Sequence, residues 1–370
     1  MQHWEEFKRP KDIERVIDII RDMKVRPLKI MEICGTHTMS IAKTGIKSLL
    51  PENIKLISGP GCPVCVTPSD RIDKIIGLAQ NKNVIIATYG DMLRVPGSKH
   101  GESLEKYKAL GYSVEIVFSS MEAIEIAKKN PEKEIVFLGI GFETTTPGSA
   151  IAIEVAIENQ LNNFSVFSMH KLCEPILRLL IEMEDFDIDG FICPGHVSII
   201  IGEKGFEFLV KDYGIPAVLA GFEAGDIVTS IYKIVEMIRD NKSEFVNEYK
   251  RLVTYEGNEI AWSKILKYFE PVDDLWRGIG NVPKSGLRIK SQYSKYDTVK
   301  KFNIELSEDE NITACSCGEI IKGKQDPISC ALFGKTCTPE NPVGPCMVSS
   351  EGACAACYKY GEFEVKQWMK

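Results

Sequence analysis

The chain has 370 residues and a net charge of −7, from 45 Lys and Arg against 52 Asp and Glu. Hydrophobic residues make up 44% of it, which excludes a disordered or fibrous protein, and the length predicts two or three domains. No basic cluster indicates nucleic-acid binding, and no apolar run approaches the ~18 residues of a membrane span. Because the charged start also lacks a signal-peptide core, we expect a cytoplasmic protein with no nucleic-acid or membrane partner.

The predicted elements begin with an amphipathic helix in residues 1–25, where Ile13, Val16, Ile17 and Ile20 recur at helical spacing. Short apolar runs that end in Gly or Pro turns then predict strands at 28–34, 54–59, 83–90, 113–118, 134–141, 164–169, 190–195 and 217–222. Helical stretches lie between them, at 70–80, 103–110, 120–129, 148–159 and 175–183. Apolar strands that alternate with helices predict an α/β fold with parallel sheets covered on both faces.

The two sets of strands resemble each other weakly, as MEICGTHTMS and FLGIGFETTTPGS show. We therefore expect two similar parallel-sheet α/β domains around a cleft, the first at residues 1–120 and the second at 121–225. Residues 226–370 are expected to form a helical connector and a smaller, loop-rich C-terminal domain, because Gly, Pro and Cys dominate from Pro271 on. In open α/β sheets chemistry gathers at the carboxyl ends of the strands, and each conspicuous motif follows a predicted strand.

The first motif, CGTH at 34–37, follows a predicted strand. Cys34 is either a small buried hydrophobic residue or a thiolate held by His37, the form that attacks substrates and binds metals. In the next motif, GPGCPVC at 59–65, Cys62 and Cys65 can close a redox-active disulfide or bind a metal, with Cys34 as a candidate third thiol.

Two further motifs follow strands of the second set. In GFETTTP at 141–147, helix capping explains Thr146 and Pro147 but not Glu143, which can orient a ligand or a partner group. His196, in CPGHVS at 193–198, is a structural or a functional histidine. Neither turn contains GxxxxGK or GxGxxG, which excludes a phosphate-binding loop.

Cysteine usage is the most specific signal. Of twelve cysteines, seven fall between residues 315 and 357: Cys315, Cys317, Cys330, Cys337, Cys346, Cys354 and Cys357. In a chain long enough to build its own core, such a group more often binds metal than forms a disulfide scaffold. The long, Gly- and Pro-rich spacing favours an iron–sulfur cluster on four thiolates, with structural zinc as the alternative. One candidate ligand set is Cys317, Cys330, Cys337 and Cys354.

These motifs, together with CTPENPVGPCMVSSEGACAACYKYG at 337–361, resemble the HypD family of [NiFe]-hydrogenase maturation proteins from residue 30 to residue 361. The resemblance implies two α/β domains related by pseudo-symmetry and a C-terminal [4Fe–4S] domain. It also implies a scaffold and electron donor that assembles the Fe(CN)2CO unit of the hydrogenase with the chaperone HypC, while HypE delivers cyanide.

The resemblance also implies roles for individual residues. Cys34 would hold the iron of Fe(CN)2CO with a cysteine of HypC as co-ligand, and Cys62 and Cys65 would be a redox or metal-binding pair. The implied cluster ligands are Cys317, Cys330, Cys337 and Cys354. Residues near the cleft would be His37, Glu143 and His196. The positions that match nothing in the family pattern are Cys173, Cys193, Cys315 and Cys357.

The implied chemistry is an electron path from the cluster through Cys62 and Cys65 to iron at Cys34. Two other functions stay open on the sequence: an iron–sulfur-dependent thiol–disulfide reductase that acts through CPVC, and a zinc-containing binding protein without redox chemistry. Whether the chain is itself an enzyme stays open as well.

Overall fold

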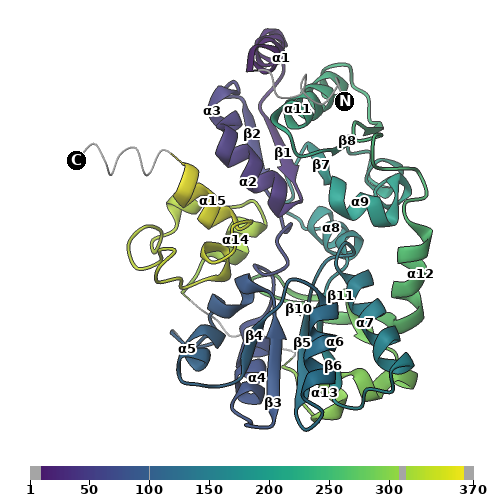
Figure 1. The fold of residues 1–370 in the computed structure, drawn as a ribbon. Coiled ribbons are helices and arrows are strands. Elements are labelled where there is room, and N and C mark those ends of the chain that lie inside the picture. The colour runs from purple at the N-terminus through teal and green to yellow at the C-terminus, as the bar shows by residue number, and fades with distance from the viewer. Residues whose placement is uncertain (1–9, 100, 308–313, 362–370) are drawn as a thin grey trace.

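A computed structural model describes residues 10–99, 101–307 and 314–361 (Figure 1). Its two parallel sheets have the strand orders β2-β1-β7-β8-β9 and β4-β3-β5-β6. The first contains β1 (Leu28–Glu32), β2 (Ile54–Ser58), β7 (Gly190–Pro194), β8 (Ala217–Ala220) and β9 (Phe245–Asn247). The second contains β3 (Val84–Thr88), β4 (Val114–Ile116), β5 (Glu134–Gly141) and β6 (Phe164–His170). In Figure 1 the first sheet lies at the top and the second at the bottom.

Helices connect the strands: α1 (Pro10–Asp22), α2 (Gly35–Thr44), α3 (Ile46–Leu49), α4 (Ser69–Ala79), α5 (Leu104–Ala109), α6 (Ser120–Lys129), α7 (Thr146–Glu158), α8 (Cys173–Ile181), α9 (Gly195–Ile201), α10 (Phe208–Lys211), α11 (Ala224–Arg239) and α12 (Glu259–Tyr268). The predicted α/β class is confirmed, and every expected strand and helix from residue 10 to residue 222 is present. None of the described helices is both long enough and apolar enough to span a membrane.

The strands read as continuous apolar runs because both faces of each sheet are covered. In β5, Phe137 packs into a core with α6 and α7, whereas Leu138 packs on the opposite face against α4. That second core continues without interruption through the first sheet and α8 and into the cysteine-rich residues of the C-terminal region. The two sheets and the C-terminal region therefore share one interior.

The two sheets repeat one topology. Numbered within each sheet, the strand order is 2-1-3-4-5 in the first and 2-1-3-4 in the second. This makes β1 equivalent to β3 and β7 equivalent to β5. The sequence comparison instead matched β1 with β5, because a strand followed by a polar turn occurs at both positions.

The expected domain boundaries at residues 120 and 225 do not follow the sheets. The first sheet combines β1 and β2 with β7, β8 and β9, so the chain leaves it after β2 and returns at β7. The second sheet lies wholly within the interruption, and residue 120 falls inside it. Apolar runs reveal which segments are strands, but they do not reveal which strands pair.

The C-terminal region also differs from the expectation. Residues 269–289 are not loop-rich: they form an antiparallel hairpin of β10 (Phe269–Trp276) and β11 (Gly280–Ile289) that packs on β6 and α8. Short helices follow at α13 (Thr298–Lys301), α14 (Cys317–Ile321) and α15 (Ala353–Tyr360). The loop-rich part is residues 314–361, here called the cysteine-rich segment, which lies beside the junction of the two sheets (Figure 1).

Candidate functional site

Two of the predicted functional residues, Cys34 and Glu143, lie where the strand order reverses in each sheet. Cys34 follows β1, and Cys193 lies in the neighbouring β7. In the second sheet, Asp91 follows β3 and Glu143 follows the neighbouring β5. Ligands of open α/β sheets bind at such points, because the adjacent loops diverge there.

Cys34 is a buried thiol at the N-terminus of α2. Its backbone N–H donates to Oε2 of Glu32 at 3.0 Å. Burial raises the pKa of the Cys34 thiol to about 12, with the charge of Glu351 acting in the same direction. The backbone N–H groups of His37 and Thr36 act in the opposite direction, as expected at a helix N-terminus. The thiol therefore keeps its proton until a cation replaces it.

His37 does not hold this thiol through its ring. Its Nε2–H donates to the carbonyl oxygen of Gly221 at 2.8 Å, and only its backbone N–H acts on Cys34. Burial lowers the pKa of His37 to about 4, so the ring is neutral at pH 7. Its Nδ1 has no hydrogen-bond partner among the described residues. His196 stacks on Phe222 at a ring-centroid distance of 3.9 Å, and His37 contacts the same ring in a tilted arrangement at 4.8 Å.

Glu143 approaches the same region from the second sheet. Its Oε1 accepts the backbone N–H of Cys173 at 2.8 Å, while its buried Oε2 has no partner within the described ranges. Burial raises the pKa of Glu143. Burial also raises the pKa of the Cys173 thiol, on which the charges of Glu143, Cys34 and Cys193 act as well. Cys173 and Cys193, which the family pattern did not place, thus lie close to Cys34.

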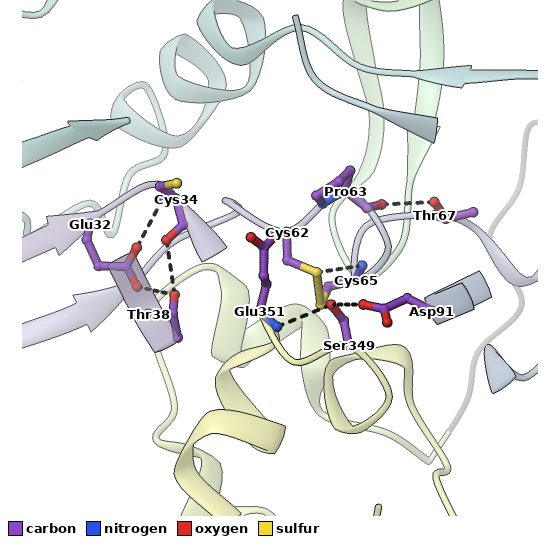
Figure 2. Close-up of a disulfide and its surroundings, with 10 residues drawn as sticks. All are labelled: Glu32, Cys34, Thr38, Cys62, Pro63, Cys65, Thr67, Asp91, Ser349 and Glu351. Atoms are coloured by element: carbon purple, nitrogen blue, oxygen red, sulfur yellow. Dashed lines mark hydrogen bonds between the residues drawn. A yellow bond between two sulfur atoms is a disulfide. The ribbon is translucent and has the colours of Figure 1, made fainter. Parts of the chain in front are cut away.

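Cys62 and Cys65 form a disulfide, as one of the two sequence interpretations expected (Figure 2). The loop that carries them lies directly on the CGTH turn: the backbone N–H of Gly35 donates to the carbonyl oxygen of Gly61 at 3.1 Å. A Cβ on Gly61 would lie 2.3 Å from the backbone nitrogen of Cys34. Glycine at this position therefore allows the two motifs to touch.

The cysteine-rich segment groups six of its seven cysteines. Sγ of Cys315 lies 3.1 Å from Sγ of Cys317, and the thiol of Cys317 also bonds to Cys346. Burial raises the pKa of the Cys354 thiol, and the charges of Cys317, Cys315, Cys337 and Cys330 act in the same direction. Cys357 instead lines an adjoining cavity of about 550 Å³ with Lys47 and Asp326.

An iron–sulfur cluster suits this donor set, because thiolates are its usual ligands. Gly344 leaves room for the sulfur atoms of this group: a Cβ there would lie 2.3 Å from Sγ of Cys315 and 3.3 Å from Sγ of Cys317. Within the described ranges, no three His, Cys, Asp or Glu side chains are arranged as a metal site. Four thiols for a cluster are available in the predicted set of Cys317, Cys330, Cys337 and Cys354, and Cys315 and Cys346 lie beside it.

The cysteine-rich segment contacts both sheets next to the disulfide (Figure 2). Thr36 Oγ1 donates to Oε1 of Glu351 at 2.7 Å, and Ser349 Oγ donates to Oδ2 of Asp91 at 3.0 Å. Both cysteines of the disulfide and Cys346 line one small cavity. The structure thus brings Cys34, the disulfide and the cysteine-rich segment into one continuous region.

Sequence reasoning missed two carboxylates of this region. Glu32 is fully buried, and burial raises its pKa to about 7. An acidic residue in the middle of the apolar run LKIMEIC was a signal from which a role for Glu32 could have been predicted. Glu351 lies in an irregular segment, and no pattern in the sequence indicated its contact with Thr36.

Fold and site together define a class: a two-sheet α/β protein whose strand ends carry a buried thiol and a disulfide beside a cysteine-rich segment. A family model described as "HypD: Hydrogenase formation hypA family" matches residues 11–361. The chain belongs to this hydrogenase formation family, and the resemblance seen in the motifs is confirmed.

Curated relatives agree along their whole length. The chain is 47% identical to hydrogenase maturation factor HypD2 of Bradyrhizobium diazoefficiens, with 92% of both chains covered. It is 43% identical to hydrogenase maturation factor HypD of Cupriavidus necator, with 98% of both chains covered. It is 41% identical to hydrogenase maturation factor HypD of Escherichia coli K12, with 98% of this chain and 99% of the relative covered.

Proposed function

We propose that this chain acts in hydrogenase maturation, as a scaffold and electron donor for the assembly of the Fe(CN)2CO unit. HypC would share the iron of this substrate with the chain, and HypE would deliver the cyanide groups. The observation that carries the proposal is the order of the sulfur sites: the CGTH turn of Cys34 packs on the loop of the Cys62–Cys65 disulfide, and the disulfide shares a cavity with Cys346 of the cysteine-rich segment.

Cys34 would be the residue that holds the iron. Its thiol loses the proton when the metal binds, and the backbone N–H groups of Thr36 and His37 stabilise the thiolate that results. Two buried polar atoms, Nδ1 of His37 and Oε2 of Glu143, have no partner among the described residues and would contact the ligands of the iron. His196 would hold Phe222 against the ring of His37.

The disulfide would store two electrons as a dithiol. In the cysteine-rich segment, Cys317, Cys330, Cys337 and Cys354 would hold a [4Fe–4S] cluster. When bound, such a cluster supplies electrons one at a time. The cavity that Cys346 shares with the disulfide supports a transfer between these two places.

Burial argues against the alternative of a general thiol–disulfide reductase. Such an enzyme needs a sulfur that its substrate can reach. Cys62 is 5% exposed and Cys65 is 2% exposed. An internal electron acceptor next to them, such as iron held at Cys34, suits this burial better than a disulfide on another protein.

The test replaces Cys34 by alanine in cells that lack their own maturation factor. We expect Cys34→Ala to abolish hydrogenase activity while the purified variant keeps the far-UV circular dichroism and melting temperature of the wild type. Cys357→Ala is the matched control, because Cys357 lies apart from the other cysteines of the segment, and it should retain activity. Normal maturation by Cys34→Ala would show that the proposed site is wrong.

A further inference from the structure

The turn between β10 and β11 touches both redox elements of the chain. The backbone N–H of Arg277 donates to the carbonyl oxygen of Val66 at 2.8 Å, and Val66 is bonded to Cys65. The next residue, Gly278, packs against Gly318, which is bonded to Cys317. Two neighbouring residues of one turn thus contact the residue after a disulfide cysteine and the residue after a cysteine of the cysteine-rich segment.

The second of these contacts has no room for a side chain. A Cβ on Gly278 would lie 2.2 Å from Cα of Gly318, and a Cβ on Gly318 would lie 2.3 Å from the carbonyl oxygen of Gly278. The φ angle of Gly278 is +76°, a conformation that glycine adopts without strain. The two backbones therefore lie against each other.

The side chain of Arg277 lies on the same route. It is buried, and its Nη1 donates to the carbonyl oxygen of Pro96 at 3.2 Å. Because the next residue, Gly278, touches Gly318, this fixed positive charge lies near Cys317 and favours electron-rich states of a centre held there.

We propose that Arg277 and Gly278 form the bridge by which electrons pass from the cysteine-rich segment to the Cys62–Cys65 disulfide. The bridge rests on the proposed function, because it specifies the route within that redox pair. It runs from Cys317 and Gly318 across the glycine contact to Gly278 and Arg277, and then through the hydrogen bond to Val66 and Cys65. Arg277 and Gly278 are positioning residues in this route.

The step balances with a low-potential one-electron donor, for which dithionite serves in the test. A cluster held by the cysteine-rich segment would accept two electrons one after the other from the donor, which is oxidised, and would pass them to the disulfide. The S–S bond breaks, two protons are taken from solvent, and Cys62 and Cys65 become thiols.

The test follows the formation of these two thiols after anaerobic mixing with dithionite, by alkylation and mass spectrometry. Gly278→Ala separates the two backbones, and Gly318→Ala opens the same contact from the opposite side without a residue at positive φ. Gly280→Ala is the matched control: it lies in the same turn at φ +102°, and a Cβ there meets open space. Protein from which a chelator has removed the metal serves as the blank. Dithiothreitol reduces the Cys62–Cys65 disulfide directly from solvent and gives the rate of that direct reaction.

We expect Gly278→Ala and Gly318→Ala to slow the dithionite reaction about tenfold or more, since small misplacements of reacting groups have effects of this size. Gly280→Ala should react at the wild-type rate, and dithiothreitol should reduce all variants alike. Wild-type rates in folded Gly278→Ala and Gly318→Ala would overturn the bridge and leave the proposed function intact. A wild-type disulfide that dithionite reduces no faster than in the blank would overturn both.

Arg277→Met tests the charge separately. Loss of a buried cation should lower the midpoint potential of the metal centre, and a tenfold change in the equilibrium constant is about 59 mV for a one-electron couple. Arg288→Met, on the exposed side of β11, is the control. An unchanged midpoint potential in Arg277→Met would show that the guanidinium charge has no part in the electron transfer.

Discussion

Two buried cysteines of this protein differ in how their ionisation is controlled. Burial raises the pKa of both Cys193 and Cys34. Only Cys34 lies where a helix begins, so that backbone N–H groups oppose the effect of burial. Of these two thiols, Cys34 is thus the one whose thiolate form the surrounding backbone N–H groups stabilise.

A buried histidine outside the site predicts how acid affects the fold. His170 is buried at the end of β6, its Nε2 lies 2.8 Å from Ser149 Oγ, and burial lowers its pKa to about 4. Below pH 6.5 the unfolded chain binds a proton that the folded chain does not, so stability falls as the pH drops toward 4. The effect of this one residue is on the order of 3 kcal/mol.

The measurement is urea denaturation between pH 7 and pH 4.5 for the wild type and for His170→Gln. The variant should be less stable at pH 7, yet its free energy of unfolding should fall less steeply with acid. If the free energy of unfolding depended on pH equally in the two proteins, folding would not lower the pKa of His170.

At the scale of elements, the β10–β11 hairpin is fixed to both the second sheet and α4 by charge. Lys171, directly after β6, donates to Asp274 at 2.5 Å and to the carbonyl oxygen of Leu275 at 2.8 Å. Arg71 of α4 donates to the other oxygen of Asp274 at 3.2 Å. Because Lys171 is fully buried, Asp274 supplies the charge that compensates it.

Asp274→Asn should destabilise the protein by about 3–5 kcal/mol, because it leaves a buried ammonium group without its partner. The double variant Lys171→Met with Asp274→Asn removes both charges and should recover much of this loss. Chemical denaturation at pH 7 measures both. If the double variant were as unstable as the single one, packing rather than charge would hold the hairpin.

The same hairpin shows where sequence patterns stop being informative. Most strands of the two sheets were predictable because they are buried on both faces and therefore read as apolar runs, whereas β9, which is three residues long and only partly buried, was not predicted. In β10, by contrast, charged and apolar residues mix, since Asp273 lies at the surface and Asp274 meets Lys171. Similarly, CGTH and CPVC were recognisable as local motifs, but Glu351 reaches Thr36 across 315 positions of sequence.

At the scale of the whole molecule, one apolar core connects both sheets with the cysteine-rich segment. Cys62, Cys173, Cys193 and four cysteines of that segment belong to it, together with the strand residues of both sheets. Metal bound in the segment would therefore support the fold as well as its chemistry.

Metal analysis of protein purified without oxygen decides between the two centres that the cysteine spacing allowed. We expect about four irons and four acid-labile sulfides per chain, as one [4Fe–4S] cluster requires. Extra iron without sulfide would indicate that Cys34 is loaded. A single zinc without sulfide would contradict the redox mechanism and leave a zinc-containing binding protein.

The interrupted first sheet also bears on how the protein is made. A ribosome that adds roughly 5–20 residues per second completes β1 and β2 on the order of ten seconds before their neighbour β7 begins. During that time the nascent chain carries Cys34, Cys62 and Cys65 without the sheet that buries them. Their surroundings are complete only after the cysteine-rich segment has been synthesised. A prematurely terminated chain thus cannot form the region in which Cys34, the disulfide and the cysteine-rich segment meet, and only finished molecules can.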